Sequence, residues 1–228
     1  MIDEDFKKQY ADWLKNRPRA QRNRPYWWGD ARWGKATRPV VGITWHEATA
    51  YCNWLKSCLA QAGAPFQVWP ETLVKAVAWQ NARVRLPSEA EWEKAARGAA
   101  GRRWPWGDAW QEDRANTEEA GLGETTAVGV FPDGASPYGV LDMAGNVWEW
   151  TRSRWGRRSI RTPDYGYPYR PDDGREESGG PDLRVVRGGS WLDDQRDARC
   201  AVRSRHVPDF FYSLIGFRVV VSLSASGF

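Results

Sequence analysis

The sequence of 228 residues is poor in the side chains that build metal centres and disulfide frameworks. It contains two histidines and three cysteines, and the cysteines are Cys52, Cys58 and Cys200. An odd number of cysteines without metal-ligand spacing predicts neither a disulfide framework nor a zinc site. No apolar run approaches the ~20 residues that cross a bilayer. We therefore expect no membrane span.

Signals for export and for nucleic-acid binding are missing as well. The opening residues, MIDEDFKKQYADW, contain no apolar core and do not resemble a signal peptide, so the default expectation is a cytoplasmic protein. Lysine is scarce, with 7 residues against 26 arginines, and no long basic run occurs. The net charge of +4 therefore lacks the clustering that is typical of nucleic-acid binding, and we expect no nucleic-acid partner.

Tryptophan and arginine are present in excess, with 16 and 26 residues respectively. The mean hydropathy of −0.70 and the 27% of charged residues are typical of a globular protein. Arginine forms forked pairs with carboxylates and stacks on aromatic faces. The composition therefore predicts a fold that is held together by arginine–tryptophan and arginine–carboxylate contacts.

Two helices are marked by the residues that cap them. Thr44 and Glu47 form a capping-box pair, and apolar residues follow at helical spacing until Gly63. Ser88 and Glu91 repeat this arrangement at the start of a second, shorter helix. These two segments are the only long stretches of the sequence in which caps and periodicity agree.

The pattern becomes irregular beyond the second helix. Between residues 101 and 183, Gly, Pro, Asp and aromatic residues interrupt the sequence every few positions. Strand-like runs return at residues 183–187 and 217–222. We therefore predict an α+β fold with two main helices, short antiparallel strands and a very high loop content.

Five motifs in a fixed order indicate a family. They are RLPSEAEWEKAARG (85–98), WPWGD (104–108), GVLDMAGNVWEWT (139–151), RVVRGGSW (184–191) and GFRVV (216–220). Together they closely resemble the formylglycine-generating-enzyme/sulfatase-modifying-factor domain, a variant of the C-type lectin fold. The resemblance implies a domain of this fold over residues 38–228, preceded by a divergent or truncated N-terminal segment over residues 1–37.

The third motif corresponds to a structural calcium site of this family. The resemblance assigns to Ca²⁺ the side chains of Asp142 and Glu149 and the backbone carbonyls of Gly145 and Val147. Hard oxygen ligands in an irregular loop suit this ion. A second family site would use Asn116 and Thr117, although Ala120 stands where the family carries an aspartate. We expect the ion to be structural at both places.

The family's oxidases convert a substrate cysteine to formylglycine with two cysteines that follow the GGS motif and hold copper. Asp193 and Ala198 occupy these two positions here. Cys200 alone cannot supply a two-thiolate copper site. The related sulfoxide synthases need a histidine-rich iron-binding domain, and the chain has only His46 and His206. We therefore expect neither copper nor iron, and no enzyme activity of these kinds.

Residues 192–214 interleave framework residues with positions that follow no period. These positions are Leu192, Asp193, Asp194, Ser204, Arg205, His206, Val207, Phe210, Phe211, Tyr212, Ser213 and Leu214. The layout resembles the variable region of diversity-generating retroelement proteins, which display a mutable ligand-binding surface on this scaffold. Adenine-directed mutagenesis of Asn-type codons cannot yield Glu, Lys, Gln, Met or Trp, and none of these types occurs at the twelve positions. We predict that they bind a ligand, with a protein as the expected partner.

Five of these residues are predicted to be the energetic anchors of binding: Arg205, His206, Phe210, Phe211 and Tyr212. Three consecutive aromatic residues on a loop favour recognition over core packing. None of the sixteen tryptophans falls at the twelve positions, so the indole rings are predicted to be scaffold.

Two other functions remain open. One is a catalytically inactive accessory or regulatory domain of a larger protein, such as a kinase, a peptidase or an NTPase. The other is a non-standard oxidoreductase of the formylglycine-generating type, for which Asp193, Cys200 and Arg203 are the candidate residues.

Overall fold

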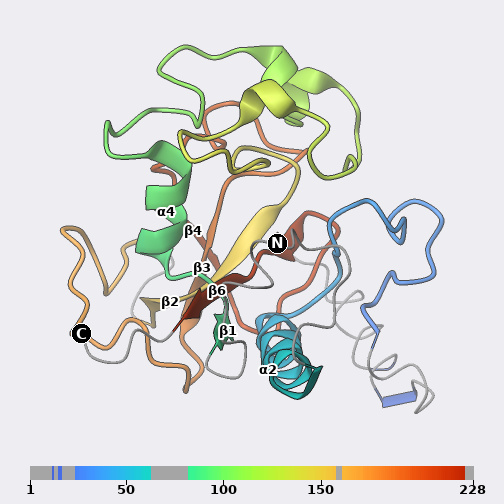
Figure 1. Cartoon of the computed structure of the whole chain (residues 1–228), viewed down its shortest axis with the longest axis vertical. Coiled ribbons are helices and arrows are strands. Elements are labelled where there is room, and N and C mark those ends of the chain that lie inside the picture. Colours follow the sequence, from blue (N-terminus) through green and yellow to red (C-terminus); the bar gives the residue numbers. More distant parts are fainter. Residues whose placement is uncertain (1–11, 13–14, 17–23, 63–81, 158–160, 224–228) are drawn as a thin grey trace.

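A computed structural model describes residues 12, 15–16, 24–62, 82–157 and 161–223. In this part of the chain, two α-helices and six short strands are joined by long loops (Figure 1). The fold is α+β with a high loop content, as the sequence predicts. None of the helices in the described part is long and apolar enough to cross a membrane.

Both capped helices are confirmed. They are α2 (Trp45–Ala62) and α4 (Glu89–Arg97). The Glu47 amide donates to Thr44 Oγ1 (3.1 Å), and the Thr44 amide donates to Glu47 Oε2 (2.9 Å). Ser88 and Glu91 make the same reciprocal pair at the start of α4, with distances of 3.2 and 2.8 Å. These capping boxes satisfy amide groups that a helix N-terminus leaves without partners.

The strands form a four-stranded and a two-stranded sheet. They are β1 (Ala82–Arg85), β2 (Trp148–Gly156), β3 (Leu183–Arg187), β4 (Ser204–His206), β5 (Ile215–Phe217) and β6 (Val220–Leu223). The larger sheet has the order β4-β3-β2-β5, with β2 and β5 parallel and the other pairs antiparallel. The smaller sheet pairs β1 with β6. The run predicted at 183–187 is β3, whereas the run predicted at 217–222 is divided between β5 and β6.

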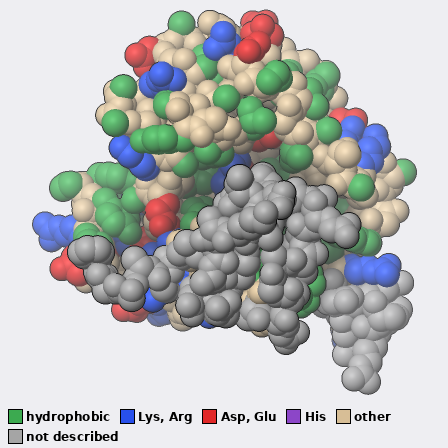
Figure 2. Space-filling model, viewed as in Figure 1, with side chains coloured by type: hydrophobic (Ala, Val, Ile, Leu, Met, Phe, Trp, Pro, Cys, Tyr) green, Lys and Arg blue, Asp and Glu red, His purple; other side chains and the backbone are tan. Residues whose placement is uncertain are grey.

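The segment between α4 and β2 consists mainly of loops with three single turns of 3₁₀ helix in its described residues. These turns are η3 (Glu112–Arg114), η4 (Glu118–Ala120) and η5 (Pro132–Gly134). In Figure 1 this green to yellow segment forms the upper part of the molecule, and Figure 2 shows apolar side chains scattered over it among acidic and basic ones. Exposed apolar residues here include Leu122, Val128 and Val130.

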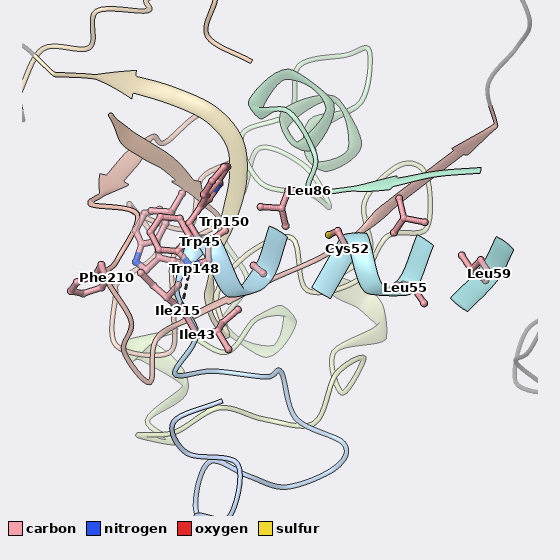
Figure 3. Close-up of a cluster of buried hydrophobic side chains, with 13 residues drawn as sticks. Ile43, Trp45, Cys52, Leu55, Leu59, Leu86, Trp148, Trp150, Phe210 and Ile215 are labelled. Carbon is pink, nitrogen blue, oxygen red and sulfur yellow. Dashed lines mark hydrogen bonds between the residues drawn. The ribbon is translucent and has the colours of Figure 1, made fainter. Parts of the chain in front are cut away.

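A tryptophan-rich core connects α2 to the larger sheet (Figure 3). The residues of α2 that face it are Trp45, Ala48, Cys52, Leu55 and Leu59, and the sheet contributes Trp148, Trp150, Val186 and Ile215. Trp150 is fully buried, and the Trp45 indole donates from Nε1 to the Thr151 carbonyl (2.9 Å). Large rigid rings thus fill a core that has little regular secondary structure around it, which confirms the scaffold role for these tryptophans.

A buried ion-pair network ties α4 to β3 and to the loop that precedes β4. Glu89 is fully buried and accepts from Arg187 Nη1 (3.0 Å) and from Arg203 Nη2 (2.8 Å). Arg187 also donates to Glu93 (2.6 Å), and its guanidinium lies 5.4 Å from the centre of the Trp92 ring. The predicted use of arginine for carboxylate pairing and for contact with indole rings is therefore confirmed.

Candidate functional site

Three of the four residues assigned to the calcium site line one hollow beside β2. Asp142, Val147 and Glu149 lie in its wall together with apolar side chains such as Phe217. The fourth residue, Gly145, lies two residues before Val147, and its carbonyl accepts a hydrogen bond from the Val147 amide (2.9 Å). The structure therefore brings the assigned residues to one place.

The two carboxylates of this hollow are compensated differently. Arg218 donates from Nε to Glu149 Oε2 (2.5 Å) and from Nη2 to Glu149 Oε1 (2.7 Å), and the Trp92 indole donates to the same carboxylate (2.6 Å). Asp142 Oδ2 accepts from the Gly129 amide (2.7 Å), and burial raises the pKa of the Asp142 carboxyl. A bound cation would offset this desolvation, so Asp142 fits a ligand of Ca²⁺.

The second assigned position shows an oxygen without a partner. Asn116 is 1% exposed, and its Oδ1 accepts no hydrogen bond from the part of the chain that the structure describes, although its Nδ2 donates to the Glu124 carbonyl (2.9 Å). Thr117 Oγ1 donates to Glu119 (2.7 Å). An unsatisfied buried amide oxygen also fits a cation ligand. Within the described ranges no three His, Cys, Asp or Glu side chains gather as a metal centre. A cation at either place would therefore depend on carbonyl and amide oxygens as well.

The positions of the family's two cysteines lie in the loop after β3. Asp193 Oδ2 accepts from Trp148 Nε1 (2.8 Å) and from the Ser190 hydroxyl. Ala198 and Cys200 are fully buried. Burial raises the pKa of the Cys200 thiol to about 12, so this thiol is protonated at neutral pH and is not a ready nucleophile or metal ligand.

The twelve residues predicted to bind a ligand differ widely in exposure. Leu192, Val207 and Tyr212 are exposed. Asp193, Asp194, Ser204, Arg205, His206 and Leu214 are half-buried, and Phe210, Phe211 and Ser213 are buried. Of the three consecutive aromatic residues, only Tyr212 offers an exposed ring. The expectation that all three favour recognition over core packing is therefore wrong for Phe210 and Phe211.

The residues predicted to be the energetic anchors of ligand binding lie on two faces of the larger sheet. The Phe210 ring stacks on His206 with a centroid distance of 4.0 Å, and Tyr212 lies 6.4 Å from Phe210. Arg205 points to the other face of β4, where its guanidinium lies 5.5 Å from the Trp155 ring. Neighbouring residues of a strand alternate between faces. The structure thus groups His206 with Tyr212 and separates Arg205 from both.

The stacked His206 predicts an acid-sensitive contribution to stability. Burial lowers the pKa of His206 to about 4, whereas an unfolded chain has a histidine pKa of about 6.5. The unfolded state therefore binds more protons between these values, and stability falls as the pH falls through this window. The His206→Phe variant keeps a flat ring against Phe210 but cannot bind a proton there. Between pH ~7 and pH ~4.5 its free energy of unfolding should fall by about 2–3 kcal/mol less than that of the parent. Urea unfolding of both proteins at the two pH values measures this difference. An unchanged pH dependence in the variant would contradict the assignment.

Aromatic residues far from this segment in the sequence lie against it. Trp27 is 6.1 Å from Tyr212 and 6.4 Å from Trp33, and Trp33 is 5.7 Å from Trp191. We call these four residues the aromatic wall. Tyr212 is exposed, and the three tryptophans are half-buried. Phe211 lies behind the wall, 6.4 Å from Trp27.

Backbone hydrogen bonds hold the two halves of the aromatic wall together. The Gly42 amide donates to the Tyr212 carbonyl (3.2 Å), and the Tyr26 amide donates to the Gly42 carbonyl (3.0 Å). Gly42 has φ +73°, and a Cβ atom there would lie 2.6 Å from Cε3 of Trp27. One local signal in the sequence indicates this arrangement, the cluster of aromatic residues between Tyr26 and Trp33, but no motif links that segment to Tyr212.

Comparison with known proteins gives one family match and several long alignments. A model of the sulfatase-modifying factor enzyme 1-like domain family matches residues 7–223. The serine/threonine-protein kinase pkn1 of Chlamydia pneumoniae is 35% identical over 197 residues, which are 84% of this chain and 25% of the kinase. The inactive C-alpha-formylglycine-generating enzyme 2 of Mus musculus is 31% identical over 226 residues, covering 92% of this chain and 58% of that protein.

A solved structure has the same fold. Treponema denticola variable protein 1 aligns with a TM-score of 0.60 and 27% identity, over 86% of this chain and 74% of that one. The chain spans between about a quarter and three fifths of the length of the two curated relatives.

Proposed function

Because the chain belongs to the sulfatase-modifying factor enzyme 1-like domain family, we propose that it is the ligand-binding protein of a diversity-generating retroelement. Residues 192–214 would be its variable, protein-binding surface. The aperiodic layout of residues 192–214, between the GGSW and IGFR motifs, carries this proposal, and the replaced cysteines argue against the family's oxidase chemistry. Asp193 is hydrogen-bonded to Trp148 and Ser190, and Ala198 has no functional group, so the scaffold lacks the two thiolates of the family's oxidases.

The likeness to a variable protein supports the same function. Treponema denticola variable protein 1 shares the fold over most of both chains. Its name describes a variable protein, and this chain carries its aperiodic segment between the GGSW and IGFR motifs. The similarity is therefore consistent with a display role for the segment.

The scaffold around the segment is suited to display. Arg187 and Arg203 both bind the buried Glu89, which fixes the chain on either side of the loop after β3. Leu192, Val207 and Tyr212 remain exposed on this rigid base. A surface held by buried ion pairs loses little conformational entropy when it binds a ligand. Because these ion pairs fix the loops, the exposed residues can also change without a change in loop structure.

The gene neighbourhood tests this function. The proposal requires a reverse transcriptase gene and an adenine-rich template repeat close to the gene for this chain. Sequencing of the source locus should find both. A complete locus without either element would contradict the proposal.

A second candidate function is a regulatory domain of a larger protein. The observation that favours it is the match to pkn1, in which the aligned region makes up 25% of a protein named as a kinase. An open reading frame that joins this chain to a kinase domain would support this function over the first.

A non-standard oxidoreductase is less favoured because Cys200 is buried and its thiol has a pKa of about 12. A measured activity that Cys200→Ser abolished would restore that function.

We also propose that Ca²⁺ stabilises the loop before β2, with Asp142, Val147, Gly145 and Glu149 as the residues that would hold it. Ca²⁺ at about a hundred times its dissociation constant would add about 2.7 kcal/mol, which corresponds to a Tm increase of about 5–10 °C for a chain of this size. Asp142→Asn should abolish the increase, because asparagine tolerates the left-handed backbone (φ 55°) but lacks the charge.

Thermal unfolding with CaCl₂ and with EDTA measures this effect. Asp133→Asn, at an exposed carboxylate in η5, is the matched control and should respond to Ca²⁺ as the parent does. An equal Tm with CaCl₂ and with EDTA in the parent would refute the calcium proposal.

A further inference from the structure

The aromatic wall joins two parts of the chain in one surface. Trp27 and Trp33 come from the loop that precedes α2, and Trp191 and Tyr212 flank or belong to the proposed variable region. The ring centroids of Tyr212 and Trp27, of Trp27 and Trp33, and of Trp33 and Trp191 are separated by 5.7–6.4 Å, so the four rings form one continuous cluster. The aromatic wall therefore combines three tryptophans outside the twelve positions with Tyr212, which is proposed to vary.

The Trp191 end of this cluster is apolar. The Trp191 indole donates from Nε1 to the Ser213 carbonyl (3.4 Å), so its polar atom is directed into the protein. Leu192, which follows Trp191 in the chain, is also an exposed apolar residue. Rigid rings that offer carbon atoms favour a ligand that buries flat apolar groups and needs few hydrogen bonds.

The loop that carries Trp27 and Trp33 is weakly basic. Residues 24–40 contain four basic residues and one acidic residue, a net charge of +3. Arg32 lies 4.5 Å from the Trp33 ring with 54% of its side chain exposed, and Lys35 is exposed nearby in the chain. Such a loop attracts acidic groups of a partner.

An acidic residue, Glu124, weakens the positive electrostatic potential of this loop. Glu124 lies 2.6 Å from Arg38 Nη2 and 3.6 Å from Arg32 Nε, and it offsets part of the positive charge. Single-stranded nucleic acids also stack on aromatic rows, but their binding depends on several cations that contact phosphates. The partly compensated charge of the loop therefore favours a peptide over a nucleic acid.

We propose that the aromatic wall binds an extended, proline-rich segment of a partner protein with acidic flanking residues. A polyproline II helix rises about 3.1 Å per residue, so neighbouring rings of the wall are about two residues apart along it. Such a segment is preformed, and aromatic-lined surfaces bind it by burying proline rings. This proposal rests on the proposed function, because it names the partner of the surface that includes Tyr212.

Binding of synthetic peptides to the full chain tests the proposal. The probe is an octaproline peptide with paired glutamates at both ends, and the control peptide replaces the prolines with alternating glycine and serine. Calorimetry should show saturable binding of the proline peptide and a dissociation constant at least about tenfold weaker for the control.

Variants of the protein locate the binding to the aromatic wall. Trp33→Ala should weaken binding at least about tenfold, as expected for a central aromatic contact. Trp54→Ala is the matched control, because Trp54 is an exposed tryptophan (54%) in α2 outside the wall, and it should leave binding unchanged. Tyr212→Ala, at an exposed ring, is a second test if Trp33→Ala fails to fold. Arg32→Ala should weaken the glutamate-flanked peptide more than a serine-flanked one.

Several results would overturn the proposal. They are no saturable binding, equal binding of the control peptide, equal affinities of the Trp33→Ala and Trp54→Ala variants, or tighter binding of an oligouridine than of the peptide. The gene neighbourhood separates this failure from failure of the proposed function. A locus with a reverse transcriptase and no peptide binding refutes the peptide partner alone, whereas peptide binding without these genes refutes the retroelement assignment alone.

Discussion

Glu89→Ala should lower the free energy of unfolding by about 3–5 kcal/mol. Glu89 is fully buried and compensates two guanidinium groups, those of Arg187 and Arg203. Arg187 is itself fully buried, and among the described residues its charge would keep Glu93 alone as a partner carboxylate. Removal of one partner from a buried ion pair costs more than the pair contributes, because a charge remains in a site that excludes water.

Thermal and urea unfolding of the parent and the variant measure this loss. A chain of this size should show a Tm decrease on the order of 10 °C. Glu177→Ala is the matched control, because Glu177 is an exposed carboxylate (69%) whose partner Arg154 also contacts Asp182. The control should change stability by less than about 0.5 kcal/mol. Similar small effects of both substitutions would show that the buried network does not hold the fold.

Trp150→Ala should cost about 3–5 kcal/mol of stability. Trp150 lies at the centre of the core between α2 and the larger sheet and is fully buried. Its indole Nε1 donates to the Ile43 carbonyl (3.4 Å), and its ring meets His206 edge-on at 6.4 Å. Truncation would leave a large cavity beneath the proposed binding segment, and a loop-rich fold has few regular elements that can move to fill it.

The contrast between two tryptophans checks this explanation of the tryptophan excess. Trp54→Ala, at an exposed ring of α2, should change the free energy of unfolding by less than about 0.5 kcal/mol. Circular dichroism during urea unfolding gives both values. If Trp150→Ala were tolerated as well as Trp54→Ala, the buried indoles would not be the scaffold.

The parts of the fold with local signals could be predicted from the sequence. Both helices were predicted correctly because their capping boxes and apolar spacing are short-range patterns. The strand β2 was missed, although it is the longest of the described strands. Its residues are buried on both faces and include arginines that reach carboxylates elsewhere, so the alternation that marks a half-exposed strand is absent. Whether this segment forms a strand therefore depends on contacts with residues that are distant in the sequence.

The candidate binding surface was predictable only in part. The segment 192–214 could be singled out because its residues break the framework pattern. The separation of Arg205 from His206 follows from strand alternation, which requires β4 to be recognised first. The contribution of Trp27 and Trp33 could not be predicted, because only the folded chain brings that loop to Tyr212. The sequence also did not separate buried Phe211 from exposed Tyr212, since this depends on what covers each ring.

The central claim is that residues 192–214 form a variable ligand-binding surface. The most direct measurement is sequencing of the codons for residues 185–220 in many cells of the source population, together with any template repeat. We predict that amino-acid differences fall at the twelve proposed positions and coincide with adenines of the template, whereas Arg203, Gly216 and Arg218 stay unchanged. Identical codons throughout the population, or differences spread equally over framework positions, would contradict the claim.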